Sequence, residues 1–377
     1  MTTAMHARPR PRVTILGGFL GAGKTTLLNA ILRQADRRFA VIVNDFGAVN
    51  IDARLVADIE GTEGEVALSN GCICCSIRGD LLAAVFRLCE RPQPPEHILI
   101  ETSGVSDPGA IASTFAQPGV DELVRLNAIV VAVDPESFPD LMGSDRRLAR
   151  RQVATADLVV LTKDDLVSAA RRSQVKTLVR EDVPHARVVR SSRDCAPVEL
   201  IVGTIEASAL QRHRQLRADD VLDVHVHDAA GPPSGDHAHA HDHTLVYSTW
   251  CFRSDAPLSP RRLRKALQQL PPDVFRIKGI VELTNRPGDR AILQVVGRRA
   301  ELYLDEPWGD VTPHSEIVVI GKEGSLDPQR LRALFDDCVR SRDDGSEGFF
   351  GEMLGYFSRL LGGPASTREP DSGERNR

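Results

Sequence analysis

Long apolar runs are absent from this sequence of 377 residues. No stretch approaches the roughly 20 apolar residues that a membrane-spanning helix needs, and the basic start MTTAMHARPRPR lacks the apolar core of a secretory signal. We therefore expect a cytoplasmic protein without a membrane partner. An excess of charge of one sign is absent too, because 47 basic and 52 acidic residues give a net charge of −5. This balance argues against general binding of nucleic acid or anionic membranes.

Cysteine is sparse and odd in number, which argues against a disulfide framework. Three of the seven cysteines lie within four positions, at Cys72, Cys74 and Cys75. Adjacent cysteines rarely bridge, because the geometry of a disulfide is hard to reach there. Such a cluster in a cytosolic chain indicates metal binding or redox chemistry. The 11 histidines are also unevenly spread, since six of them lie between residues 225 and 243.

The first two hundred residues alternate between short apolar segments and helical ones. The apolar segments are rich in Val, Ile and Leu with little polar alternation, as in strands buried on both faces of a parallel sheet. This order predicts a doubly wound, mostly parallel α/β domain over residues 12–222, after a disordered start at residues 1–11. The predicted strands are Arg12–Leu16, Phe39–Val43, His97–Glu101, Ala128–Val133, Leu158–Thr162 and Arg187–Arg190, and the predicted helices include Lys24–Gln34, Asp80–Cys89, Asp107–Thr114 and Leu166–Val179.

The composition changes at residues 223–243, where Gly, Pro, Ser, Asp and His replace periodic apolar residues, so we expect a flexible linker there. A small α+β domain is predicted over residues 244–340, followed by a largely disordered segment over residues 341–377. The second domain contains the predicted strands LVYSTWCFR, FRIKGIVEL, RAILQVVGR, AELYL and SEIVVIG and the predicted helices Ser259–Leu270 and Pro328–Val339.

A phosphate-binding loop follows the first predicted strand. The pattern Gly18-x4-Gly23-Lys24-Thr25 is that of a P-loop, in the strand–loop–helix context that the motif requires. Its glycines allow backbone N–H groups to wrap phosphates at the start of a helix. We expect Lys24 to bridge the β- and γ-phosphates and Thr25 to ligate Mg²⁺, both as catalytic residues. The nucleotide contacts expected in this loop are Gly18, Gly21, Ala22, Gly23, Lys24, Thr25 and Thr26.

A second nucleotide signal, Thr162-Lys163-Asp164-Asp165, closes the strand that begins at Leu158. GTPases read guanine with Asn-Lys-x-Asp at this place, where the Asp carboxylate accepts hydrogen bonds from guanine groups that adenine lacks. Thr162 stands in place of Asn, whereas Lys163 and Asp165 keep their positions, so we expect these three residues to bind GTP. The alternative is a helix N-cap formed by Asp164 or Asp165.

Acidic residues at strand ends are candidates for sensing the nucleotide. The third predicted strand ends in Glu101-Thr-Ser-Gly104, and an acid followed by x-x-Gly suits a switch that senses the γ-phosphate through Mg²⁺ and a Gly amide. We expect Glu101 to be catalytic and to bind magnesium, and Gly104 to bind GTP. Asp134 ends the next strand and competes for the magnesium role. Asp45 and Asp52, after the second strand, are either magnesium contacts or loop caps.

Residues 44–47, which read NDFG, leave the second predicted strand where a first switch would lie. The thiol cluster lies between this segment and the switch candidate at Glu101–Gly104, where residues 70–75 read NGCICC. Three soft thiolates at Cys72, Cys74 and Cys75 suit Zn²⁺, Co²⁺ or Cu⁺. Three ligands leave a fourth position open, which suits delivery of an ion better than a permanent structural site. Buried structural cysteines and a redox pair are the alternatives. The remaining cysteines are expected in the core, at Cys89, Cys195, Cys251 and Cys338.

Imidazoles gather in the predicted linker, where residues 236–243 read DHAHAHDH. Imidazole suits Zn, Ni, Co and Cu, and a mobile segment would bind them in several interchangeable weak modes. A merely solvated linker is the alternative. The expected auxiliary metal ligands are His237, His239, His241 and His243.

In combination, GGFLGAGKTT, NDFG, GCICC, ETSG, TKDD, the His-rich linker and the C-terminal α+β domain resemble the CobW-type family of metal-handling P-loop GTPases, over about residues 12–340. The resemblance implies a GTPase that binds metal at C-x-C-C and transfers it to a client metalloprotein, with zinc as the best-supported cargo. Many relatives carry Glu where this chain has Asp45 and an acid where it has Ala48, which puts a secondary acidic metal site in doubt. Thr162 also departs from Asn, although its hydroxyl keeps a hydrogen-bonding group.

The predicted function is thus a GTP-dependent zinc metallochaperone that uses Mg²⁺, with no nucleic-acid partner and with a homodimer left open. We expect slow intrinsic hydrolysis, because no arginine finger is assigned beyond Arg78 as a candidate. One alternative keeps the GTPase but makes cobalt or iron the cargo, for cobalamin synthesis or nitrile hydratase activation. A P-loop kinase or ATPase with incidental thiols would prefer ATP, and a metal buffer would bind metal regardless of nucleotide.

Overall fold

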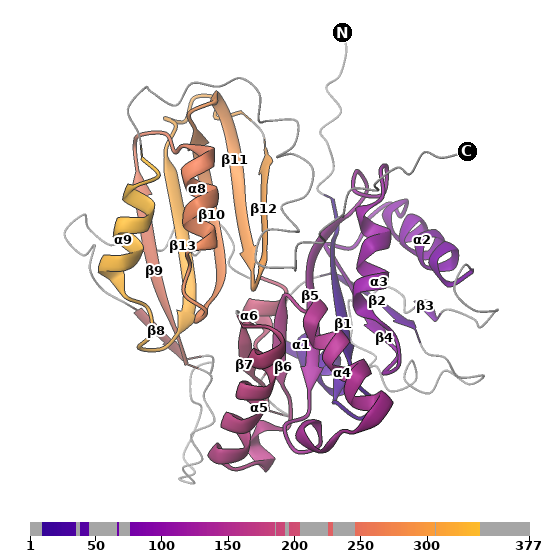
Figure 1. The fold of residues 1–377 in the computed structure, drawn as a ribbon. Coiled ribbons are helices and arrows are strands. Elements are labelled where there is room, and N and C mark those ends of the chain that lie inside the picture. Colours follow the sequence, from indigo (N-terminus) through magenta and orange to yellow (C-terminus); the bar gives the residue numbers. More distant parts are fainter. Residues whose placement is uncertain are drawn as a thin grey trace, which may run out of the picture.

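Two β-sheets organise the chain (Figure 1). A computed structural model describes nine stretches of residues, namely 10–34, 38–44, 66–67, 76–184, 186–192, 196–203, 225–228, 246–305 and 307–339. Within them, no helix is both long enough and apolar enough to cross a membrane.

The first sheet has seven strands in the order β3-β2-β4-β1-β5-β6-β7, and every neighbouring pair is parallel. Its central strand is β1, which leads into the P-loop. The predicted strands are all present, with small shifts at their ends, and β3 is an addition. The bounds are β1 (Arg12–Gly18), β2 (Phe39–Asn44), β3 (Val66–Ala67), β4 (His97–Thr102), β5 (Arg125–Val133), β6 (Leu158–Leu161) and β7 (Val188–Arg190).

Helices cover both faces of this sheet, because side chains along each strand alternate between two cores. In β1, Val13 and Ile15 pack in the core shared with α2, α3, α4 and α5, whereas Leu16 packs in the core shared with α1 and α6. The doubly wound α/β prediction is therefore confirmed. The helices are α1 (Lys24–Gln34), α2 (Ser76–Cys89), α3 (Pro108–Ala112), α4 (Gly143–Thr155), α5 (Ala169–Asp182) and α6 (Val198–Ile201), with short 3-10 turns η2 (Ser113–Ala116), η3 (Phe138–Asp140) and η4 (Asp164–Leu166).

The second sheet is antiparallel, with six strands in the order β12-β11-β10-β13-β9-β8. Helices α8 and α9 cover one of its faces, around the clustered rings of Trp250, Phe252 and Phe335. The predicted α+β domain is confirmed in type. The bounds are β8 (His225–Asp228), β9 (Val246–Ser254), β10 (Val274–Leu283), β11 (Arg286–Val296), β12 (Arg299–Leu304), β13 (Ser315–Lys322), α8 (Pro260–Gln268) and α9 (Pro328–Asp336).

One correction concerns the predicted linker at residues 223–243. Its residues His225–Asp228 form strand β8, which pairs antiparallel with β9 at the edge of the second sheet. A four-residue edge strand is satisfied by backbone pairing with one neighbour and does not require an apolar pattern. Composition alone therefore missed it.

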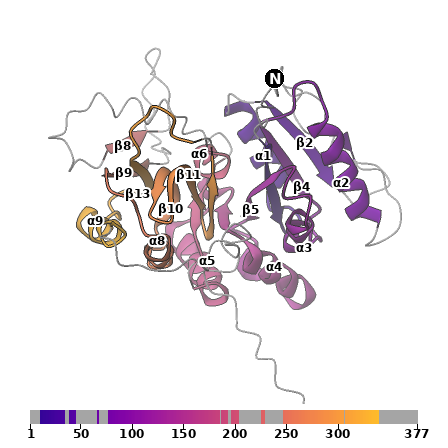
Figure 2. The ribbon, with the colours of Figure 1, turned by 90° about the horizontal axis from the view of Figure 1, so that it is seen from above.

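The two sheets share a core where they meet. Phe275, Val296, Val318 and Ile320 of the second sheet pack in the same buried cluster as α1 and α6, and α6 lies between the two sheets in Figure 2. The buried guanidinium of Arg276 donates a hydrogen bond of 3.0 Å to the Leu200 carbonyl of α6. The second domain is thus packed firmly against the first.

The turn between β11 and β12 adds polar contacts to this junction. The Asp157 carboxylate, just before β6, accepts from the Ile129 backbone N–H and from Arg299 Nε, each at 2.8 Å. The Arg298 backbone N–H donates to the Asp157 carbonyl at 3.1 Å. Gly297, with φ +54°, lies so close that an added Cβ would fall 1.7 Å from this carbonyl oxygen.

Candidate functional site

The P-loop connects β1 to α1 at the centre of the first sheet, at the carboxyl ends of the strands. Gly18, Gly21 and Gly23 all have positive φ, at +140°, +72° and +81°. At Gly18 an added Cβ would lie 2.4 Å from the Ala132 carbonyl oxygen, whereas Gly21 has nothing within 4 Å of that position. The loop therefore needs glycine for its backbone shape and leaves its outer side open for a ligand.

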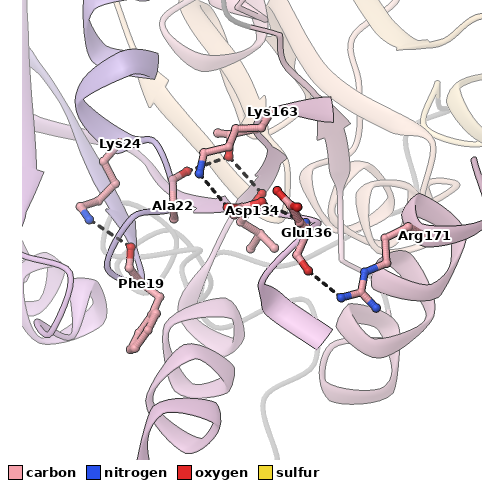
Figure 3. Close-up of polar contacts among 9 residues, drawn as sticks. Phe19, Ala22, Lys24, Asp134, Glu136, Lys163 and Arg171 are labelled. Carbon is pink, nitrogen blue, oxygen red and sulfur yellow. Dashed lines mark hydrogen bonds and ion pairs between the residues drawn. The ribbon is translucent and has the colours of Figure 1, made fainter. Parts of the chain in front are cut away.

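Three predicted catalytic residues meet at the start of α1. The Lys24 ammonium donates to the Phe19 carbonyl at 3.3 Å, so the side chain folds back over its own loop (Figure 3). The Thr25 hydroxyl donates to Glu101 Oε1 at 2.7 Å, and Glu101 is only 2% exposed at the end of β4. A hydroxyl and a carboxylate at this distance form a hard-oxygen pair of the kind that Mg²⁺ prefers.

The loop after β4 lies directly against the P-loop. An added Cβ on Gly104 would approach the Leu20 backbone nitrogen to 2.7 Å, so only glycine fits there. Gln152 of α4 holds this loop from behind, because its side-chain amide donates to the Gly104 carbonyl at 3.0 Å and to the Ser106 carbonyl at 2.8 Å. Sequence reasoning missed Gln152, since a single glutamine in an arginine-rich helix carries no motif.

The Thr162–Asp165 turn is docked on the same loop. The Thr162 hydroxyl donates to the Ala22 carbonyl at 2.7 Å, so this residue ties the turn to the P-loop. Lys163 has a left-handed backbone with φ 49°, and its ammonium pairs with the Asp134 carboxylate at 2.7 Å (Figure 3). Asp164 is buried and Asp165 is exposed. Of the two adjacent acids, Asp165 is thus the one open to a ligand.

This geometry bears on two questions that the sequence left open: whether Asp164 or Asp165 caps a helix, and whether Glu101 or Asp134 lies beside the magnesium ligand. Helix α5 is capped by Ser168, whose hydroxyl accepts from the Arg171 N–H at 3.2 Å, so neither Asp164 nor Asp165 serves as its N-cap. Asp134 contacts Lys163, whereas Glu101 contacts Thr25.

The predicted zinc ligands lie outside the described residues. This holds for Cys72, Cys74 and Cys75 and for the auxiliary ligands His237, His239, His241 and His243. The loop acids Asp45 and Asp52 and the side chain of Arg78, the arginine-finger candidate, lie outside them too. Within the stretches that the structure describes, no group of three or more His, Cys, Asp or Glu side chains is arranged to hold a metal ion. The metal site therefore remains a prediction from the sequence.

The other cysteines that the structure describes are poor candidates for metal ligands. Cys89, Cys251 and Cys338 all pack against or within the apolar cores, as predicted, and Cys195 lies outside the described residues. Burial raises the pKa of the Cys251 thiol to about 11, with a smaller contribution from Glu316. Burial, and then Asp337, raises the pKa of the Cys338 thiol to about 12. Metal binding requires the thiolate, which these two residues form poorly at neutral pH.

We therefore expect Cys251 and Cys338 to react at least about 100-fold more slowly with iodoacetamide at pH 7.5 than an exposed thiol of ordinary pKa. Raising the pH toward their pKa values should speed the reaction, because the thiolate fraction then increases. Peptide-resolved mass spectrometry of the full chain, with and without Zn²⁺, measures this. Fast modification of Cys251, or its protection by zinc, would contradict the assignment.

Comparisons with known proteins match most of the chain to one family. The family model of the CobW/HypB/UreG nucleotide-binding domain matches residues 12–190, and that of the cobalamin synthesis protein cobW C-terminal domain matches residues 247–339. A protein named zinc chaperone CobW from a Sinorhizobium species is 30% identical, with 90% of this chain and 100% of that protein covered. One of the same name from Pseudomonas aeruginosa is 31% identical, with 82% and 87% covered. A crystal structure of the Zn(II)-bound YjiA GTPase from E. coli is 26% identical, covers 88% of this chain and 99% of its own, and has a TM-score of 0.35. The chain therefore belongs to the CobW family.

Proposed function

We propose that this protein is a GTP-hydrolysing metallochaperone that binds zinc at Cys72, Cys74 and Cys75 and passes it to a client metalloprotein. The observation that carries the GTP part is the hydrogen bond of 2.7 Å from Thr162 to the Ala22 carbonyl. It joins the phosphate loop and the base-reading turn into one site. Relatives named zinc chaperone, aligned over most of this chain, support the choice of cargo.

The positions of the side chains support the nucleotide-binding roles that we propose. The backbone of Gly18–Thr26 would cradle the phosphates, and Lys24 would move from the Phe19 carbonyl to the β- and γ-phosphates. Thr25 and Glu101 would hold Mg²⁺, which supplies positive charge against the phosphate oxygens. The exposed Asp165 carboxylate would accept hydrogen bonds from guanine. The Gly104 loop, pressed on the P-loop, is the part placed to respond to the γ-phosphate.

The metal part rests on thiol chemistry. Three thiolates at C-x-C-C leave one position of a tetrahedral zinc ion open for a ligand from the client. Their segment lies between β2, which ends at Asn44, and α2, which begins at Ser76, on the chain between the two switch candidates. GTP-dependent movement there would alter the thiolate geometry. The linker histidines would serve as weaker auxiliary ligands.

Competition titration of Zn²⁺, Co²⁺ and Ni²⁺ tests this function, with a GTP analogue, with GDP and without nucleotide. We expect one tight zinc site whose affinity differs between the GTP-analogue and GDP states, and its loss in the C72S/C74S/C75S variant. The C251S variant is the matched control, because it removes a partly buried thiol that packs against the core. Affinity that ignores nucleotide would indicate a metal buffer, and tighter binding of cobalt would favour the alternative cargo. Preference for ATP would indicate a kinase or ATPase.

A further inference from the structure

Asp164 is a buried carboxylate within the base-reading turn. Its side chain is only 4% exposed, and Oδ2 accepts from Arg172 Nη1 at 3.1 Å and from the Arg190 guanidinium at 2.5 Å. Arg172 belongs to α5 and Arg190 ends β7, so one carboxylate joins two elements that flank the turn. A carboxylate at this depth is retained only when it is paired, and here it has two partners.

Three consecutive residues of the turn are each tethered to a different place. Thr162 is bonded to the P-loop, Lys163 to Asp134 after β5, and Asp164 to α5 and β7. Lys163 is also the one non-glycine residue with positive φ in the described part of the chain. An L-residue holds this backbone only where its surroundings determine it. The tethers therefore fix the turn's backbone, and the next residue, Asp165, is left exposed.

We propose that Asp164 is a positioning residue for base selection, whose ion pairs with Arg172 and Arg190 fix the turn so that the Asp165 carboxylate meets the guanine edge. The proposal rests on the proposed GTP-binding function and deepens it. Asp164 is too deeply buried to read the base itself, since its side chain is 4% exposed and both arginines hold its Oδ2 inside the protein. Its effect on selectivity must therefore pass through the backbone to Asp165.

The test measures dissociation constants of the full chain for GTP, ITP and ATP. Inosine lacks the 2-amino group of guanine, so the GTP-to-ITP ratio reports how well Asp165 is placed. In D164N we expect the preference for GTP over ITP to fall about tenfold or more, since a displacement near 1 Å weakens directional contacts strongly. ATP binding, which depends on the P-loop, should stay unchanged. D182N is the matched control, because Asp182 lies on α5, the helix of Arg172, with a side chain 10% exposed, and pairs with Arg150.

The possible outcomes distinguish a failure of the role proposed for Asp164 from a failure of the proposed GTP-binding function. If the wild-type chain shows no preference for GTP, the proposed function fails. If D165N abolishes the preference while D164N retains it, guanine reading stands and the role of Asp164 is overturned. If D164N does not fold, R172Q and R190Q each leave Asp164 one partner and should reduce the ratio by a smaller amount. Equal losses for GTP, ITP and ATP in these variants would show a purely structural role and overturn the proposal.

Discussion

GTP hydrolysis is expected to slow by about 100- to 1,000-fold when Glu101 is replaced by glutamine, with a much smaller change in GTP affinity. Glutamine keeps the size of the side chain and an oxygen that accepts from the Thr25 hydroxyl, now 2.7 Å from Glu101 Oε1. Only the negative charge is lost. The Glu101 side chain is 2% exposed and contacts Thr25, the other predicted magnesium ligand. Loss of its charge should therefore slow hydrolysis and raise the magnesium concentration that hydrolysis requires.

Single-turnover hydrolysis across a magnesium titration measures this effect, and D134N provides the control. Asp134 directly follows β5, which lies across β1 from the strand of Glu101. It is also buried, but its carboxylate pairs with Lys163. We expect D134N to alter nucleotide selectivity while its magnesium dependence stays that of the wild-type chain. A larger loss of hydrolysis in D134N than in E101Q would transfer the magnesium role to Asp134.

Replacement of Gly297 by alanine should destabilise the junction between the two sheets. The added Cβ would lie 1.7 Å from the Asp157 carbonyl oxygen. Because that oxygen belongs to the backbone and the position of a Cβ is fixed by its own backbone, the turn between β11 and β12 must move. That movement strains the Asp157–Arg299 ion pair, whose side chains are 11% and 9% exposed. We expect a loss of about 3 to 5 kcal/mol in stability, and a melting temperature lower by about 10 °C.

Gly288 supplies a control with the same backbone requirement and without the close approach. It has φ +89° in β11, and nothing lies within 4 Å of its added Cβ. G288A should therefore cost only about 1 kcal/mol, from the left-handed backbone. Thermal unfolding of the full chain, followed by hydrogen exchange at the Ile129 and Arg298 amides, compares the two variants. Equal effects in G297A and G288A would mean that the contact with Asp157 contributes nothing to the junction.

Much of the fold was predictable, because the residue pattern of each segment agrees with the place of that segment in the fold. The buried strands of the first sheet are short segments rich in Val, Ile and Leu. Gly18, Gly23 and Lys24 stand in a motif whose spacing is dictated by phosphate binding. The same holds for α9, where Asp327 and Pro328 mark the start, and the Asp327 side chain accepts from two backbone N–H groups.

The remaining features depend on contacts between distant segments. Helix α4 buries only Ala149, Gln152 and Val153, so its sequence shows no strong apolar stripe. The ion pair between Asp157 and Arg299 joins residues 142 positions apart, and no sequence motif indicates it. The motif assigns Asp165 to the base but gives Asp164 no role beyond a possible N-cap, because the two arginines that pair with Asp164 come together only in the fold.

The core shared by the two sheets has a consequence for biosynthesis. Helix α6 is complete at Ile201, but its buried cluster also needs Phe275, Val296, Val318 and Ile320. At typical translation rates those strands leave the ribosome on the order of ten seconds later. During that interval the nucleotide-binding domain would carry an apolar surface that its own residues do not cover. The nascent chain is therefore expected to rely on chaperones until β13 has been made, although its P-loop is then already complete.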